Sequence, residues 1–163
     1  MNSYLSKFLI GYDSFVKHFN VLQSVFLAFS RFYVGWIFFS SGLTKLDDWE
    51  STLFLFEYEY QVPVLNFVIA AYLATVGEII LPVLLFLGLA TRFSAIGLSI
   101  VNVVAVISLE EIAPAALNGH IIWGLLLLQV VVWGAGKLSV DRLLKVQINK
   151  NRSQLNVLAC ETH

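Results

Sequence analysis

Four stretches of about twenty mostly apolar residues set the main limit on how this chain can fold. They cover residues 21–43, 64–87, 91–109 and 112–133. A helix that crosses the hydrocarbon core of a bilayer needs about 20 such residues. The chain is 58% hydrophobic and only 13% charged, whereas soluble domains carry about 25% charged residues. We therefore expect an all-α integral membrane protein, a four-helix bundle that forms a single membrane domain over residues 1–163.

The segments that flank these stretches predict further elements. Residues 1–20 place apolar side chains at helical spacing, with charged residues between them, which predicts an N-terminal amphipathic helix on the membrane surface. The segment DDWESTLFLFEYEYQVP is acidic and aromatic, so we expect it to form a loop at the level of the lipid headgroups. Residues 145–163 are expected to form a cytoplasmic tail.

The distribution of Lys and Arg predicts the orientation. Positive residues gather in the cytoplasmic segments of membrane proteins. With the N-terminus inside, one loop on the outside holds Lys45, and the inside segments hold the other eight basic residues between Lys7 and Arg152 that flank the spans: Lys7, Lys17, Arg92, Lys137, Arg142, Lys145, Lys150 and Arg152. We therefore expect four spans with both termini in the cytoplasm.

One arginine interrupts the first apolar stretch. Arg31 lies ten residues into the predicted first span, about 15 Å deep and near the bilayer midplane. A charge at that depth costs roughly 2.5–3.5 kcal/mol on insertion scales and normally has a partner. Glu78 lies at a similar depth in the second span, so we expect an Arg31–Glu78 pair at the centre of the bundle. Such a pair either fixes the register of two helices or marks a polar pocket for a headgroup, a proton or a substrate.

Two features around this pair support close packing and irregular backbone. Ser24, Ala28, Gly35 and Gly42 follow the Arg31 face of the first span, and small residues let membrane helices approach closely. Pro82 lies four residues after Glu78 and predicts a helix kink, because a helical proline clashes with the carbonyl of residue i−4.

Other polar residues are candidate proton or ligand contacts, namely His120, Asn102 and Lys45. His120 is open to three interpretations: a hydrogen-bonded interfacial histidine, a proton carrier, or a metal ligand together with Glu110 or Glu111. We expect no metal site, and no embedded haem, since a bis-histidine haem needs two histidines at one level. A net charge of −1 gives no indication of nucleic-acid binding. No catalytic residue is assigned.

Three segments match patterns of a known family. The first span ends in GWIFFSSGLTKL, and the second reads AAYLATVGEIILPVLLFLGLATR, with a central glutamate. The last runs through HIIWGLLLLQVVVWGAGKLSVDRLL, where Ser139 or Asp141 can cap a short surface helix. In this order, over residues 26–144, they resemble the DoxX family.

The resemblance implies a four-helix protein of the bacterial inner membrane, of a kind that accompanies quinol- or thiosulfate-linked redox systems or redox and metal-stress enzymes. It implies protein partners encoded in the same operon. The cofactor and any enzymatic role stay undetermined, with a quinone as one candidate. The positions that match family patterns are Arg31, Gly42, Lys45, Glu78, Gly88, Arg92, His120, Gly134, Gly136, Ser139 and Asp141.

Three functions remain open. The first is a membrane component of a redox system, with a quinone headgroup in the pocket and Glu78 handling protons. The second is a non-catalytic scaffold that assembles partners at the bilayer. The third is a small ion or solute carrier, which would require a homo-oligomer to form a path.

Overall fold

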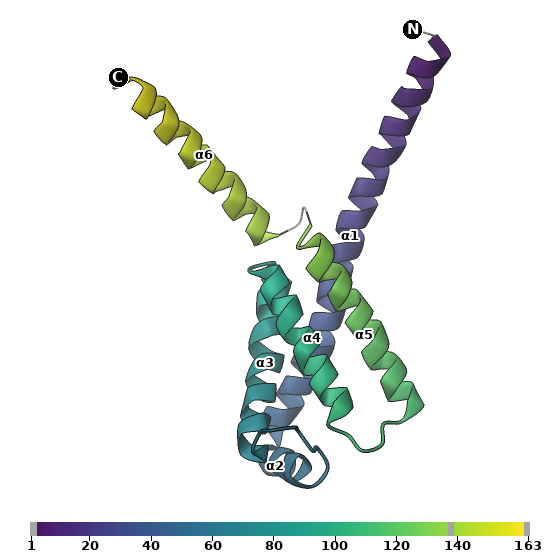
Figure 1. Ribbon diagram of the computed structural model, residues 1–163, viewed down its shortest axis with the longest axis vertical. Helices are drawn as coiled ribbons and strands as arrows, with labels where there is room; N and C mark the ends of the chain where they lie inside the picture. The colour runs from purple at the N-terminus through teal and green to yellow at the C-terminus, as the bar shows by residue number, and fades with distance from the viewer. Residues whose placement is uncertain (1–2, 137–138, 162–163) are drawn as a thin grey trace.

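Six helices make up the part of the chain that the computed structural model describes, which is residues 3–136 and 139–161 (Figure 1). Side chains are described for residues 21–136 and 139–152, together with Tyr12 and Phe19. The helices are α1 (Ser3–Asp47), α2 (Trp49–Tyr58), α3 (Phe67–Leu87), α4 (Thr91–Ile107), α5 (Pro114–Trp133) and α6 (Val140–Glu161). The all-α prediction is confirmed for these residues.

Helix α1 differs from its prediction because it runs without a break from Ser3 to Asp47. The expected boundary at residue 20, between a surface helix and the first span, does not interrupt the backbone. The part long and apolar enough to cross a membrane is Val21–Asp47. Placement of residues 1–20 on the membrane surface stays a prediction, and most of their side chains lie outside the described residues.

Two further helices are long and apolar enough to cross a membrane, namely α3 and α5. Helix α3 begins at Phe67 instead of residue 64, because Asn66 accepts a hydrogen bond from the Val68 N–H and caps the helix. Helix α5 begins with Pro114 in its first turn, where the missing N–H costs nothing. Helix α4 is also apolar but has only 17 residues.

The acidic aromatic segment forms a helix instead of the expected loop. Asp48 caps α2 by accepting a hydrogen bond from the Ser51 N–H at 2.9 Å. Phe56 is buried in a cluster with Ala70 and Ala71 of α3. This segment is therefore part of the packed structure and closes one end of it, which we call the α2 end (Figure 1).

The core forms where α1 packs on α3 and α5, and α4 packs on the same two helices. Its centre is apolar and includes Val34, Leu85, Leu98 and Leu127. Large apolar side chains also cover the outside, and Phe29, for example, is 62% exposed. An apolar exterior of this extent fits a surface that contacts lipid.

Helix α6 and the N-terminal part of α1 extend beyond the packed region, at the end opposite α2 (Figure 1). Leu143 of α6 is 70% exposed. The predicted tail from residue 145 is thus mostly helical in the described chain.

Candidate functional site

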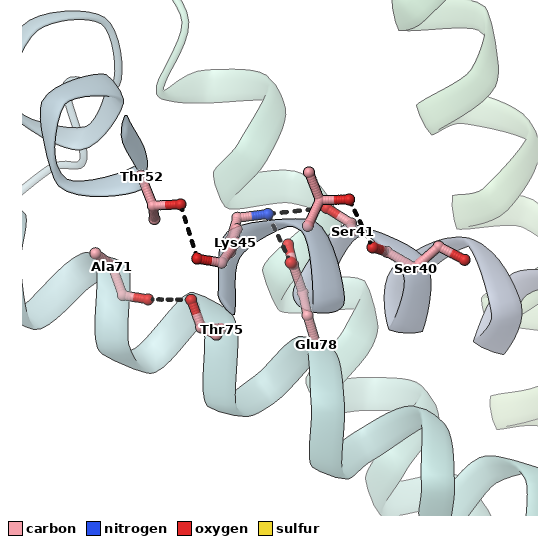
Figure 2. Close-up of polar contacts among 8 residues, drawn as sticks. Ser40, Ser41, Lys45, Thr52, Ala71, Thr75 and Glu78 are labelled. Atoms are coloured by element: carbon pink, nitrogen blue, oxygen red, sulfur yellow. Dashed lines mark hydrogen bonds and ion pairs between the residues drawn. The ribbon is translucent and has the colours of Figure 1, made fainter. Parts of the chain in front are cut away.

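An ion pair between α1 and α3 is the centre of the candidate site. The Lys45 ammonium lies 2.6 Å from Oε2 of Glu78 and donates a second hydrogen bond, of 2.8 Å, to the Ser41 hydroxyl (Figure 2). The side chains of Lys45 and Glu78 are 18% and 8% exposed. We call these two residues the cavity pair.

The predicted ion pair between Arg31 and Glu78 is therefore wrong. Glu78 lies beside Gly42 and Lys45, whereas Arg31 reaches the end of α3, where its guanidinium lies against Gly88. Arg31 and Gly42 are 11 residues apart on one helix, a rise of about 16 Å. Arg31 accordingly lies at one end of the packed helices and not halfway along them.

Local structure holds the cavity pair in place. A Cβ at Gly42 would lie 3.0 Å from the Cβ of Glu78, so glycine allows α1 to approach α3 here. Thr52 of α2 donates a hydrogen bond to the Lys45 carbonyl at 3.0 Å, near the C-terminal end of α1 (Figure 2). The Lys45 backbone is thereby held against α2, while its side chain reaches Glu78 of α3.

The cavity pair lines a hollow of about 440 Å³. Most of the lining is apolar, and the polar side chains among it are Ser41, Lys45, Tyr60, Glu78, Ser108 and His120. Small-molecule sites usually measure about 300–1,000 Å³ and combine apolar walls with a few convergent polar groups. The hollow has both properties.

His120 and Asn102 form a reciprocal pair on the wall of α4 and α5. The Asn102 amide donates to the His120 carbonyl at 2.9 Å, and Oδ1 of Asn102 lies 2.8 Å from Nδ1 of His120. A carbonyl oxygen only accepts hydrogen bonds, which fixes the amide orientation and requires Nδ1 to carry the proton. In the neutral ring, Nε2 is then an acceptor on a residue that lines the cavity.

Tyr60 belongs to the segment that covers the cavity at the α2 end. Burial raises the pKa of Tyr60, and the charges of Glu59 and Glu78 add to this effect, so its phenol remains a hydrogen-bond donor at neutral pH. The next residue, Gln61, donates from its backbone N–H to the Ser108 carbonyl at 2.8 Å. This bond ties the segment to the end of α4.

A second polar cluster surrounds the turn between α3 and α4. We call it the turn cluster; it consists of Arg31, Gly88, Ala90, Thr91 and Asp141. The Asp141 carboxylate accepts hydrogen bonds from the backbone N–H groups of Ala90 at 2.9 Å and Thr91 at 3.0 Å. It also attracts the guanidinium of Arg31, which is 2% exposed.

Several groups together lower the pKa of Asp141. Burial by itself would raise its pKa, but the bonds from Thr91 and Ala90 and the nearby charge of Lys145 hold the pKa below its ordinary value. Asp141 therefore caps α4 from a distant part of the chain. Ser139 caps α6 as the sequence indicated, through a 3.3 Å bond from the Arg142 N–H.

The remaining candidates are placed as follows. Pro82 is buried inside α3, and the kink expected there stays a prediction. Among the side chains that the structure describes (Tyr12, Phe19, 21–136 and 139–152), no three from His, Cys, Asp or Glu lie together in a way that could hold a metal ion. Arg31 is absent from the cavity lining, whereas Lys45 and Glu78 both belong to it, and a polar pocket that binds a ligand stays a prediction.

Comparison with known proteins places the chain in a family. The family model described as DoxX matches residues 26–111, more than half of the chain. The chain belongs to the DoxX family. A protein of Haemophilus influenzae, described as an uncharacterized protein, is 36% identical over 132 residues, which cover 76% of this chain and 85% of that protein. No solved structure matches.

Family membership and the three long apolar helices make this a multi-pass membrane protein. The matched residues include both members of the cavity pair, whereas His120 and Asp141 lie beyond them. Sequence reasoning had placed Lys45 in a loop and so missed its pairing. The signal that could have revealed it is the spacing of Gly42 and Lys45, which puts both residues on one helix face.

Proposed function

We propose that this protein is the membrane component of a quinone-linked redox system and that its cavity holds the quinone headgroup. The observation that carries the proposal is the position of the cavity pair. An ammonium and a carboxylate line a mostly apolar hollow of about 440 Å³ between helices that can cross a membrane. Ionisable groups at such positions are costly, and most of them mark pathways or binding sites.

The chemistry of the lining suits a quinone and a quinol in turn. A quinone ring is flat and apolar, and its two carbonyl oxygens accept hydrogen bonds, which Lys45 and Tyr60 can donate. Reduction adds two electrons and two protons, and the resulting quinol hydroxyls donate to acceptors such as the Glu78 carboxylate. Glu78 exchanges the protons, while the electrons come from a redox partner of the kind expected for this family.

The proposed topology has four crossings, with α4 as the short one. Helix α4 packs against both α3 and α5, which are long enough to span, and it is apolar throughout most of its length. The excess of Lys and Arg at the end opposite α2 supports cytoplasmic termini in a bacterial inner membrane. The cavity pair then lies toward the outer face.

Binding of a tail-less benzoquinone tests the proposal. We expect such a quinone to raise the unfolding temperature of the purified wild type, and to raise that of Glu78→Gln and Lys45→Met much less. Glu111→Gln is the matched control, because Glu111 is an exposed acid outside the cavity lining. An unchanged wild type, or an equal shift in all four proteins, would contradict the proposal.

A second candidate is a scaffold that assembles partners at the bilayer, favoured by the projection of α6 from the packed region (Figure 1). Its first turns combine exposed Leu143, Val146 and Ile148 with basic Arg142 and Lys145. Removal of residues 145–163 should then abolish co-purification with the product of a neighbouring gene while quinone binding persists. Loss of quinone binding in the truncated chain would argue against separate roles.

A further inference from the structure

The cavity has one side that reaches the lipid-facing surface. Among its lining residues, Leu73 of α3 is 58% exposed and Ile100 of α4 is 59% exposed. Both belong to helices of the membrane-spanning region. A residue that both lines a hollow and is largely exposed lies at the mouth of that hollow.

Helices α3 and α4 are in contact on one side of this mouth. Gly77 of α3 faces Val101 of α4, and a Cβ at Gly77 would lie in ordinary contact with Cγ2 of Val101, at 3.4 Å. One turn further along, a Cβ at Gly97 would lie 2.7 Å from Cδ1 of Leu81. Beyond these contacts, α3 and α4 diverge toward the α2 end (Figure 1), and the cavity lining there includes Ala74 of α3 and Val104 of α4.

The end of the cavity that faces α2 is covered. The backbone of Tyr60 forms a bridge with Leu109, and Gln61 bonds to the Ser108 carbonyl. The side chain of Gln61 also donates to the Glu110 carboxylate. These contacts span the gap between the segment before α3 and the end of α4, whereas Leu73 and Ile100 are the most exposed lining residues on the side between α3 and α4.

We propose that the ligand enters the cavity sideways from the bilayer, through an opening between α3 and α4 bordered by Leu73, Ile100 and Val104. The inference rests on the proposed function and names the ligand class: a membrane-dissolved quinone with a long hydrocarbon tail. The headgroup lies at the cavity pair, and the tail leaves through the opening into lipid. The apolar residues at the mouth match the tail, since burial of each CH₂ group stabilises the complex.

Two quinones that differ only in the tail test this route. We compare a tail-less benzoquinone with its long-chain isoprenoid counterpart at equilibrium, using the full chain in nanodiscs. In the double variant Leu73→Trp with Ile100→Trp, the indole rings fill the mouth. We expect affinity for the long-chain quinone to fall at least about tenfold, while that for the tail-less quinone changes less than about twofold, because the headgroup fits inside the cavity.

The matched control is Val76→Trp with Val103→Trp. These residues lie on the same two helices and are 50% and 55% exposed, but neither lines the cavity. Both quinones should bind this control as they bind the wild type. A further double variant, Leu73→Ala with Ile100→Ala, keeps the mouth open and should bind the long-chain quinone more tightly than the double tryptophan variant does.

The outcomes separate the two proposals. Failure of the wild type to bind the tail-less quinone overturns the proposed function. Binding of the tail-less quinone, together with an unchanged long-chain affinity in the Leu73→Trp and Ile100→Trp variant, overturns the lateral route alone. Equal loss of both quinones in that variant also overturns the lateral route, since it shows that the indole rings occupy the headgroup site.

Discussion

Helix α1 carries two cations into the packed region, and their surroundings differ. The guanidinium of Arg31 lies in the turn cluster, against the α3–α4 turn and near Asp141, where neighbouring groups fill the space. The ammonium of Lys45 lies beside Glu78 on the wall of a hollow of about 440 Å³. A charged group that packed atoms enclose can stabilise the fold but has no room for a ligand. A charged group that lines a cavity can also bind one. The difference favours a structural role for the turn cluster and agrees with the proposed binding of a ligand at the cavity pair.

The largest loss of stability is expected from a substitution at Gly88, which has φ +66°. A Cβ at this position would overlap the guanidinium of Arg31 and lie 2.7 Å from the Cβ of Ser139. Gly88→Val should therefore destabilise the protein by about 3 kcal/mol or more, or prevent its accumulation in the membrane. The measurement is the free energy of unfolding in detergent.

The control is Gly77→Ala, where the new Cβ would make an ordinary contact at 3.4 Å with Val101. It should change stability by less than about 1 kcal/mol. If Gly88→Val and Gly77→Ala changed the free energy of unfolding equally little, the turn cluster would not be tightly packed, and its contrast with the cavity pair would fail.

An intermediate effect is expected at the cavity pair. Glu78→Leu alone leaves a poorly solvated ammonium and should cost about 2–4 kcal/mol, and Lys45→Met alone leaves a carboxylate and should cost a similar amount. The double variant removes both charges and should recover to within about 1.5 kcal/mol of the wild type. Unfolding of the four proteins in a double-mutant cycle measures the coupling.

Quinone binding by the same four proteins sharpens the distinction between stability and function. The double variant should fold yet fail to bind the tail-less quinone. A double variant that regains both stability and binding would show that the cavity pair only fixes helix register.

The smallest effect concerns the pH dependence of the turn cluster. The pKa of Asp141 is depressed in the folded protein, so its contribution to stability is present above the unfolded pKa of about 3.9 and is lost as pH falls through the folded pKa. Asp141→Asn should cost about 1–2 kcal/mol at neutral pH, the usual cost of a lost cap, and the difference from the wild type should shrink below pH 4.

Asp47→Asn is the control for this measurement, because Asp47 is exposed at the opposite end of the packed region. Its unfolding free energy should follow that of the wild type across the acid range. A constant difference between Asp141→Asn and the wild type from neutral to acid pH would contradict the role of the carboxylate as a cap.

The sequence predicted the apolar helices well, since hydropathy directly reports segments that prefer lipid. It failed on the partner of Glu78 for a geometric reason. The prediction counts the depth of Arg31 in the membrane from residue 21. Helix α1 continues unbroken through Asp47, and Gly42, three turns after Arg31, is the α1 residue that lies beside Glu78. Lys45, expected in a loop, therefore reaches Glu78 from the last turn of the helix.

The turn cluster was harder to predict because its contacts join distant segments. The sequence predicts that Asp141 caps the helix that begins beside it, because Asp side chains often accept hydrogen bonds from nearby backbone N–H groups. It bonds instead to Ala90 and Thr91, about fifty residues earlier. The spacing of residues along the sequence does not predict such a long-range contact. The bond from the Arg142 N–H to Ser139 is predictable, because a residue that caps a helix bonds to a backbone N–H three residues later.

The shortness of α4 has a consequence for the surrounding lipid. With 17 residues, this helix is about 25 Å long, several ångströms less than a hydrocarbon core of about 30 Å. If α4 crosses the bilayer as proposed, the bilayer becomes thinner beside the mouth of the cavity to match the short helix. Such thinned lipid would lie directly against the proposed opening for a long-chain quinone.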